Sequence, residues 1–113
     1  GAPQLIADNA CAHHFVLGPP APSSWRDLDL AAYPVRARAG DGPWVVGHGA
    51  NVLGDPRRAL TWLVNELSGV GVSLGAGQIV TSGTCMAPLA IAPGDLVTAD
   101  FGRLGMVTLR LVA

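Results

Sequence analysis

The sequence predicts an α+β fold that is mostly β, with one packed amphipathic helix. Apolar side chains recur at the helical period over residues 56–68, and residues 106–112 alternate between apolar and polar as a strand does. Asp41-Gly42 is a strong hairpin-turn signal between two candidate strands. The chain has 113 residues, so we expect residues 1–113 to form a single domain or a fragment of one.

The helix is expected to span about residues 56–68. Asp55 can accept a hydrogen bond from a free backbone N–H at the start, and Pro56 loses nothing at the first helical position. Gly69 follows as a C-terminal stop. The apolar face that predicts the helix consists of Ala59, Leu60, Leu63, Val64 and Leu67.

Strands are expected at five places, and these are residues 28–39, 44–49, 78–82, 96–101 and 106–112. Pro34 predicts that the first is an edge strand or carries a bulge, because proline cannot donate to a neighbouring strand. Residues 4–18 are compatible with a short helix or with a bent strand. The prolines of residues 18–24 predict a loop.

The composition limits the classes of protein to which the chain can belong. Half of the residues are hydrophobic, 13% are charged and the net charge is −1. A disordered chain and a nucleic-acid-binding surface are therefore poor interpretations. So little charge suggests that a partner subunit, or a missing part of the same protein, covers apolar surface. All seven basic residues are arginine, so no lysine is present to form a Schiff base.

Two cysteines, Cys11 and Cys85, are too few for a disulfide framework. We expect reduced, mostly buried thiols in a cytoplasmic protein, since the chain opens without a secretory leader and its apolar runs are too short to span a membrane.

Two short polar segments are candidate binding sites. Ser82 and Thr84 lie on a glycine-containing loop, where hydroxyl and backbone N–H groups can bind a carboxylate or carbonyl oxygen. The alternative is an ordinary loop with solvated hydroxyls. Asp8 and Asn9 follow an apolar run, and they either cap a helix or turn or face a polar pocket.

The titratable residues give weaker signals. His13 and His14 are adjacent, so their side chains diverge and are expected to be structural rather than joint metal ligands. His48 is the best single candidate for acid–base chemistry, although a surface position is the simpler interpretation. Glu66, the only glutamate, lies in the predicted helix, and the aspartates are scattered over turns and caps. We therefore predict no metal ligands in this chain, because Mg²⁺ prefers clustered carboxylates.

Six segments taken in order carry a resemblance to a known family. They are Ile6-Ala7-Asp8-Asn9-Ala10, Phe15-Val16-Leu17-Gly18, Gly49-Ala50-Asn51-Val52-Leu53-Gly54-Asp55-Pro56, residues 59–65, Ser82-Gly83-Thr84 and Pro93-Gly94-Asp95. Together they resemble the C-terminal half of 2-oxopent-4-enoate (2-hydroxypenta-2,4-dienoate) hydratases, which are close to 4-oxalocrotonate decarboxylases in the fumarylacetoacetate hydrolase superfamily. The resemblance covers nearly all of the chain.

The resemblance implies a mixed β-roll and a complete enzyme about twice this length. It implies a divalent cation, magnesium or manganese, that polarises a small 2-oxo or 2-hydroxydienoate acid. A hydratase of this kind adds water to a 2-hydroxy-2,4-dienoate in the meta-cleavage degradation of aromatic compounds, whereas the decarboxylase releases carbon dioxide. Oligomers are common in the family.

The chain departs from the family in lacking the metal-binding glutamates and the lysine and aspartate near the substrate, which the family's N-terminal half supplies. By resemblance, Ser82 is the candidate catalytic residue, and it binds substrate with Gly83 and Thr84. Asp8 and Asn9 match a segment near that site, and Asp95 and Asp100 match structural positions.

Two kinds of function follow from the sequence. The first is a lyase, hydratase or decarboxylase, that is inactive until an acidic N-terminal half or companion chain completes it. The second is a half-size, non-catalytic relative that acts as a small-molecule binding module or scaffold. The sequence leaves open whether the chain is a fragment, a natural half or a degenerate relative.

Overall fold

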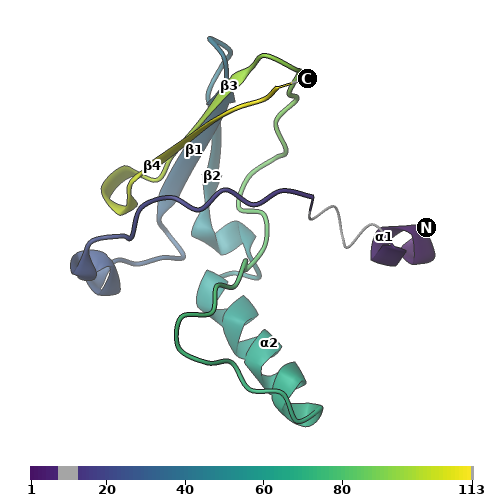
Figure 1. Cartoon of the computed structure of the whole chain (residues 1–113). Helices are drawn as coiled ribbons and strands as arrows, with labels where there is room; N and C mark the ends of the chain where they lie inside the picture. The colour runs from purple at the N-terminus through teal and green to yellow at the C-terminus, as the bar shows by residue number, and fades with distance from the viewer. Residues whose placement is uncertain (8–12, 113) are drawn as a thin grey trace.

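A four-stranded antiparallel sheet with strand order β2-β1-β3-β4 is the centre of the fold (Figure 1). The structure is a computed structural model that describes residues 1–7 and 13–112. The strands are β1 (Pro34–Ala39), β2 (Val45–His48), β3 (Leu96–Asp100) and β4 (Met106–Arg110). The α-helices are α1 (Ala2–Ala7) and α2 (Pro56–Gly69), and short 3₁₀ turns occupy Ser23–Asp27, Gly49–Asn51 and Gly102–Leu104.

The strand β1 is central rather than at an edge, so that prediction from Pro34 was wrong. Pro34 is the first residue of the strand and is paired with His48, and at a strand end a missing N–H costs little. Val35 and Ala37 point to one face and are buried, while Arg36 on the opposite face is exposed. This alternation gives the sheet an apolar inner face and a polar outer face.

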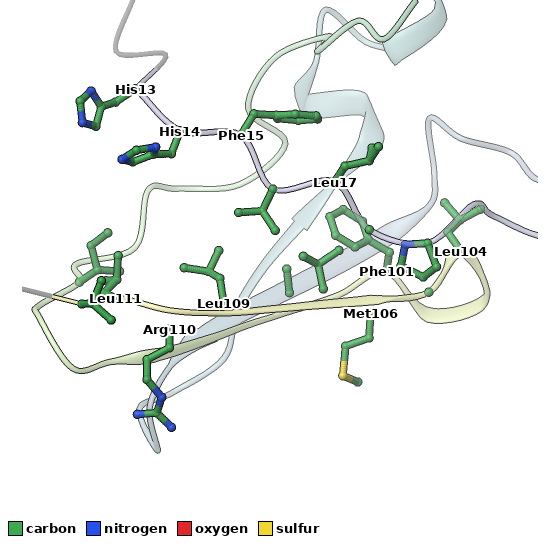
Figure 2. Close-up of a pocket in the computed structure, with 18 residues that line it drawn as sticks. His13, His14, Phe15, Leu17, Phe101, Leu104, Met106, Leu109, Arg110 and Leu111 are labelled. Carbon is green, nitrogen blue, oxygen red and sulfur yellow. The ribbon is translucent and has the colours of Figure 1, made fainter. Parts of the chain in front are cut away.

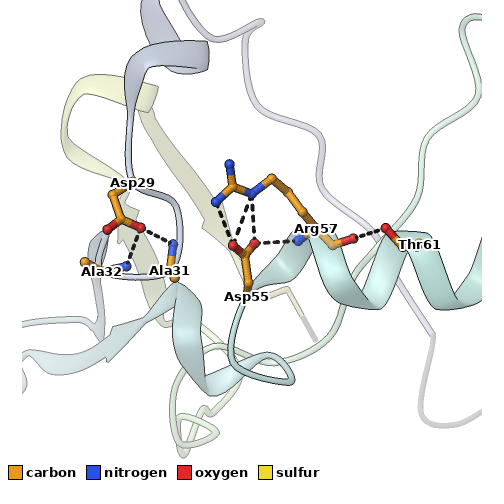
Figure 3. Close-up of polar contacts among 6 residues, drawn as sticks. All are labelled: Asp29, Ala31, Ala32, Asp55, Arg57 and Thr61. Atoms are coloured by element: carbon orange, nitrogen blue, oxygen red, sulfur yellow. Dashed lines mark hydrogen bonds and ion pairs between the residues drawn. The ribbon is translucent and has the colours of Figure 1, made fainter.

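The strand β1 also begins later than predicted, because residues 28–33 form a turn. The Asp29 carboxylate accepts hydrogen bonds from the backbone N–H groups of Ala31 (3.1 Å) and Ala32 (3.2 Å) (Figure 3). This side chain satisfies backbone donors that a strand would need to pair. The remaining predicted strands of the sheet are found within two residues of their expected ends.

The strand predicted at residues 78–82 is absent from the described structure, where this segment is irregular. Both edges of the sheet are formed by other strands, β2 and β4. An apolar run becomes a strand only when a neighbour pairs with its backbone, so composition alone was misleading here. The segment is part of a long connection that leads from α2 to β3 (Figure 1).

The predicted helix is confirmed as α2, with the expected start. The Asp55 carboxylate accepts a hydrogen bond from the Arg57 backbone N–H (2.8 Å) and forms an ion pair with the Arg57 guanidinium (2.6 Å) (Figure 3). The predicted apolar face is only partly packed, since Ala59 is buried but Leu60 and Val64 remain 41% and 42% exposed. The amphipathic pattern therefore predicts the helix correctly, and its apolar face is only partly covered.

Acid is expected to destabilise the fold through Asp55 and Asp100. Hydrogen bonds from Arg57 lower the pKa of Asp55, and the Gly102 backbone N–H together with Arg36 lowers the pKa of Asp100. The pKa of each carboxyl group is lower in the folded chain than in the unfolded chain, where it is near 3.8. Each group therefore stabilises the fold fully at a pH above the unfolded value. This stabilisation is lost as the pH falls through the folded-state pKa. Thermal melts followed by circular dichroism should show a melting temperature that drops below about pH 4.

Asp55→Asn should make the melting temperature less dependent on pH, because it removes one of the two carboxyl groups, Asp55 and Asp100, whose pKa is lowered by folding. Asp41→Asn removes a carboxylate from the β1–β2 turn and serves as the matched control, with the acid sensitivity of the wild type. Equal pH profiles for Asp55→Asn and the wild type would contradict the assignment.

Candidate functional site

Two of the predicted site residues, Ser82 and Gly83, line a hollow of about 320 Å³ next to the start of α2. Several separate parts of the chain converge on it: the turn before β1, β1 itself, the segment between β2 and α2, the 82–85 loop and the end of β3. Its other lining residues are Leu30, Tyr33, Val35, Gly49, Val52, Pro56, Cys85, Phe101 and Leu104. The wall is thus mainly apolar, with a few polar groups from Ser82, Tyr33 and Cys85.

The loop that carries Ser82 is fixed to β2 through one carbonyl group. The Cys85 carbonyl accepts hydrogen bonds from the His48 backbone N–H (3.1 Å) and from Nδ2 of Asn51 (2.7 Å). Gly47 permits this approach, because a Cβ there would collide with the Cys85 carbonyl and with Met86. Asn51 and Gly47 are therefore positioning residues for the loop.

Sequence reasoning did not identify these positioning roles. Asn51 belongs to residues 49–56, a segment that carries part of the family resemblance and contains the start of the predicted helix. Nothing in those residues indicates that a segment 34 positions later lies against them. The signal that was available, a glycine within a predicted strand at Gly47, is typical of a close backbone approach.

The polar groups of the hollow differ in what they contact. The Tyr33 hydroxyl donates to the Phe101 carbonyl (2.9 Å) and accepts from the Arg103 N–H (2.8 Å), so it ties the turn before β1 to the end of β3. Ser82 is half-buried at the wall, and Gly83 turns the loop with a φ of 122° beside Val52. Ser82 is thus a hydroxyl-bearing residue among those that line the hollow.

The other predicted residues are placed elsewhere or not described. Thr84 is exposed and does not line the hollow, and Asp8 and Asn9 lie outside the described residues, as does Cys11. His48 is exposed at the end of β2. His13 and His14, with ring centroids 4.3 Å apart, line a different groove on the inner face of the sheet (Figure 2).

The described residues do not fit a metal centre. Nowhere in residues 1–7 and 13–112 do three His, Cys, Asp or Glu side chains gather as metal ligands would. Three of the aspartates are engaged in local contacts instead: Asp55 caps α2, Asp95 accepts from the Ala92 N–H (2.8 Å), and Asp100 orders the turn at Gly102 (2.9 Å). The structural roles expected for Asp95 and Asp100 agree with these contacts.

Comparison with known proteins identifies relatives of the chain. No model of a known protein family matches it. The 2-keto-4-pentenoate hydratase of Paraburkholderia xenovorans (strain LB400) is 35% identical over 102 residues, which are 90% of this chain and 38% of the hydratase. The 4-oxalocrotonate decarboxylase of Pseudomonas putida is 32% identical over 108 residues, or 96% of this chain and 40% of the decarboxylase.

Solved structures agree with the sequence relatives. The 4-oxalocrotonate decarboxylase from Pseudomonas putida G7, complexed with magnesium and adipate, superposes with a TM-score of 0.83 at 32% identity. The match covers 96% of this chain and 41% of that one, and the same decarboxylase complexed with calcium and acetate matches equally well. The chain is therefore homologous to the 2-keto-4-pentenoate hydratases and 4-oxalocrotonate decarboxylases, as the resemblance predicted, and spans about two fifths of their length.

Gly47→Ala is expected to destabilise the fold by about 1–3 kcal/mol, the usual cost of forcing an extra group into a filled site. The added methyl group would push the 82–86 segment away from β2. Urea unfolding gives the free energy, and hydrogen exchange at residues 82–86 should show which segment loosens.

Gly69→Ala is the matched control, because nothing lies within 4 Å of a Cβ at that position near the end of α2. It should leave stability unchanged or slightly raised. Equal stability of the Gly47→Ala and Gly69→Ala variants would show that the 82–86 segment does not depend on Gly47.

Proposed function

We propose that this chain is the C-terminal part of a metal-dependent hydratase that adds water to 2-hydroxy-2,4-dienoates in the degradation of aromatic compounds. The observation that carries the proposal is the homology to hydratases and decarboxylases, which extends over 90% or more of the chain. The hollow lined by Ser82 and Gly83 supports it as a place for the substrate. We further propose that residues 1–113 form part of a fumarylacetoacetate-hydrolase-like β-roll in a cytoplasmic, oligomeric enzyme.

The chemistry of the hollow supports a small acid as its ligand. A volume of about 320 Å³ lies at the lower end of the range for small-molecule sites. In this proposal the apolar wall, including Val52 and Leu104, contacts the hydrocarbon part of the dienoate. The Ser82 hydroxyl donates to a carboxylate or carbonyl oxygen, and Gly83 lets the loop backbone approach it. Thr84, Asp8 and Asn9 remain proposed contributors at the rim.

We propose that the divalent cation, magnesium or manganese, is bound by ligands that lie outside the described residues of this chain. The related decarboxylase structures are complexed with magnesium or calcium. Hard cations need converging carboxylates, and those of Asp55, Asp95 and Asp100 are engaged in local contacts. The chain's part in catalysis is then to bind and orient the substrate, and an acidic N-terminal half or companion chain completes the site.

Two alternatives have support of their own. The fold match is to a 4-oxalocrotonate decarboxylase, which favours a decarboxylase of the same substrate class as strongly as a hydratase. The lack of a carboxylate cluster in residues 1–7 and 13–112 favours a non-catalytic binding or scaffold module. The two alternatives predict different results in the same assay.

Turnover measures the proposed function directly. The chain alone should not consume 2-hydroxypenta-2,4-dienoate with Mg²⁺ in an ultraviolet assay, because the carboxylates of residues 1–7 and 13–112 form no metal centre. Turnover should appear when the chain is coexpressed with the part of the Pseudomonas putida G7 decarboxylase that it does not match, and EDTA should abolish it. Carbon dioxide release from 4-oxalocrotonate instead would identify a decarboxylase, and no turnover in either form would favour the binding module.

Ser82→Ala in the completed enzyme should lower kcat/KM by about 10- to 100-fold, since a hydrogen bond to a charged group contributes about 1.5–3 kcal/mol. Ser68→Ala, at an exposed position near the end of α2, is the control and should leave kcat/KM unchanged. Unchanged kcat/KM for Ser82→Ala would remove Ser82 from the site.

A further inference from the structure

A large apolar groove lies on the inner face of the sheet next to the hollow at Ser82, with which it shares the lining residues Phe101 and Leu104. Its volume is about 990 Å³. The floor is formed by β3 and β4, with Leu109 among the side chains that point into it, and the extended segment 13–19 crosses above (Figure 2). Phe15 and Leu17, which line the groove from that segment, are 60% and 64% exposed.

The exposed apolar surface is too extensive for a protein that stands alone. Two other large hydrophobic side chains that line the groove are more than half exposed, Ile91 (54%) and Val112 (83%). Only four hydrophobic residues in the described part of the chain are buried. Contiguous apolar patches of this kind mark interaction sites.

The groove suits a polypeptide better than a small molecule. Among residues 1–7 and 13–112, only β3 pairs with the strand β4, so one side of the β4 backbone offers N–H and C=O groups to another strand. Both β4 and the segment 13–19 line the groove. A polypeptide can bury the apolar side chains and also pair with this backbone edge, as in recognition by strand addition.

The relatives indicate which polypeptide this is. The Pseudomonas putida G7 decarboxylase has the same fold over this chain, with a TM-score of 0.83, yet the matched region is only 41% of that protein. The remaining three fifths is a polypeptide large enough to cover the groove. Most residues that line the groove are apolar, and none of those that the structure describes is acidic, so an apolar surface of the partner would fit it.

We infer that the groove between segment 13–19 and the strands β3 and β4 is the docking surface for the polypeptide that matches the rest of the relatives' length. This inference rests on the proposed function, in which the same polypeptide supplies the metal ligands. Docking at this face would cover the apolar side chains of the groove and the free edge of β4 in one interface.

The test coexpresses the chain with the unmatched part of the Pseudomonas putida G7 decarboxylase and measures complex formation by native mass spectrometry. The variant is Phe15→Asp with Leu17→Asp, because both side chains are largely exposed and the substitutions need not disturb the sheet. The control is Val46→Asp on β2, a 58% exposed apolar residue on the outer face. Circular dichroism of each variant confirms that the fold is kept.

The expected result is a one-to-one complex with the wild type and with Val46→Asp, and at least a tenfold loss of affinity with the double variant. A complex that tolerates the double variant would place the interface elsewhere, and the absence of any complex would overturn the inference. Self-association lost in the double variant would identify a second copy of the chain as the occupant. Complex formation without turnover would instead refute the proposed function and leave the docking surface intact.

Discussion

The pairing of β1 with β3 is the interaction on which the rest of the structure depends. It joins residues 64 positions apart in sequence, with Arg36 opposite Asp100 in the register and their side chains in an ion pair of 2.9 Å. Without it the sheet would separate into the β1–β2 and β3–β4 hairpins. The ion pair is exposed and contributes little by itself, so the pairing is stabilised mainly by backbone hydrogen bonds and the buried side chains of β1.

The same pairing forms the candidate site. Tyr33 and Val35 line the hollow from the start of β1, and Phe101 and Leu104 line it from the segment after β3. The Tyr33 hydroxyl joins these two parts of the chain by donating to the Phe101 carbonyl. The loop with Ser82 is then held against this frame at the Cys85 carbonyl. The hollow is therefore a product of long-range contacts, and its closing loop is attached to the frame of the sheet.

The polar and apolar residues of this chain have different positions in the architecture. Asp29, Asp55 and Asp100 satisfy backbone N–H groups at turns and at a helix start, so these carboxylates stabilise local structure. Many large apolar side chains remain exposed, and about half of them lie in the groove or on α2. The described helices include none with the length and apolarity to cross a membrane. The occupant that we propose for the groove is a polypeptide.

The sequence by itself determined the features that depend on neighbouring residues. Asp55 and Pro56 specify the start of α2, Asp41-Gly42 specifies the β1–β2 hairpin, and the alternation over 106–112 specifies β4, because capping, turn formation and side-chain alternation act within a few residues. The similarity to the hydratases and decarboxylases could also be found from the sequence, because the motifs that carry it are short and occur in a fixed order along the chain.

Only the tertiary structure decided which segments pair and which residues meet. It made β1 central despite Pro34, left residues 78–82 without a strand partner, and brought Gly47 and Asn51 against Cys85. Each of these outcomes depends on contacts between residues distant in sequence, and local propensity carries no information about a distant partner.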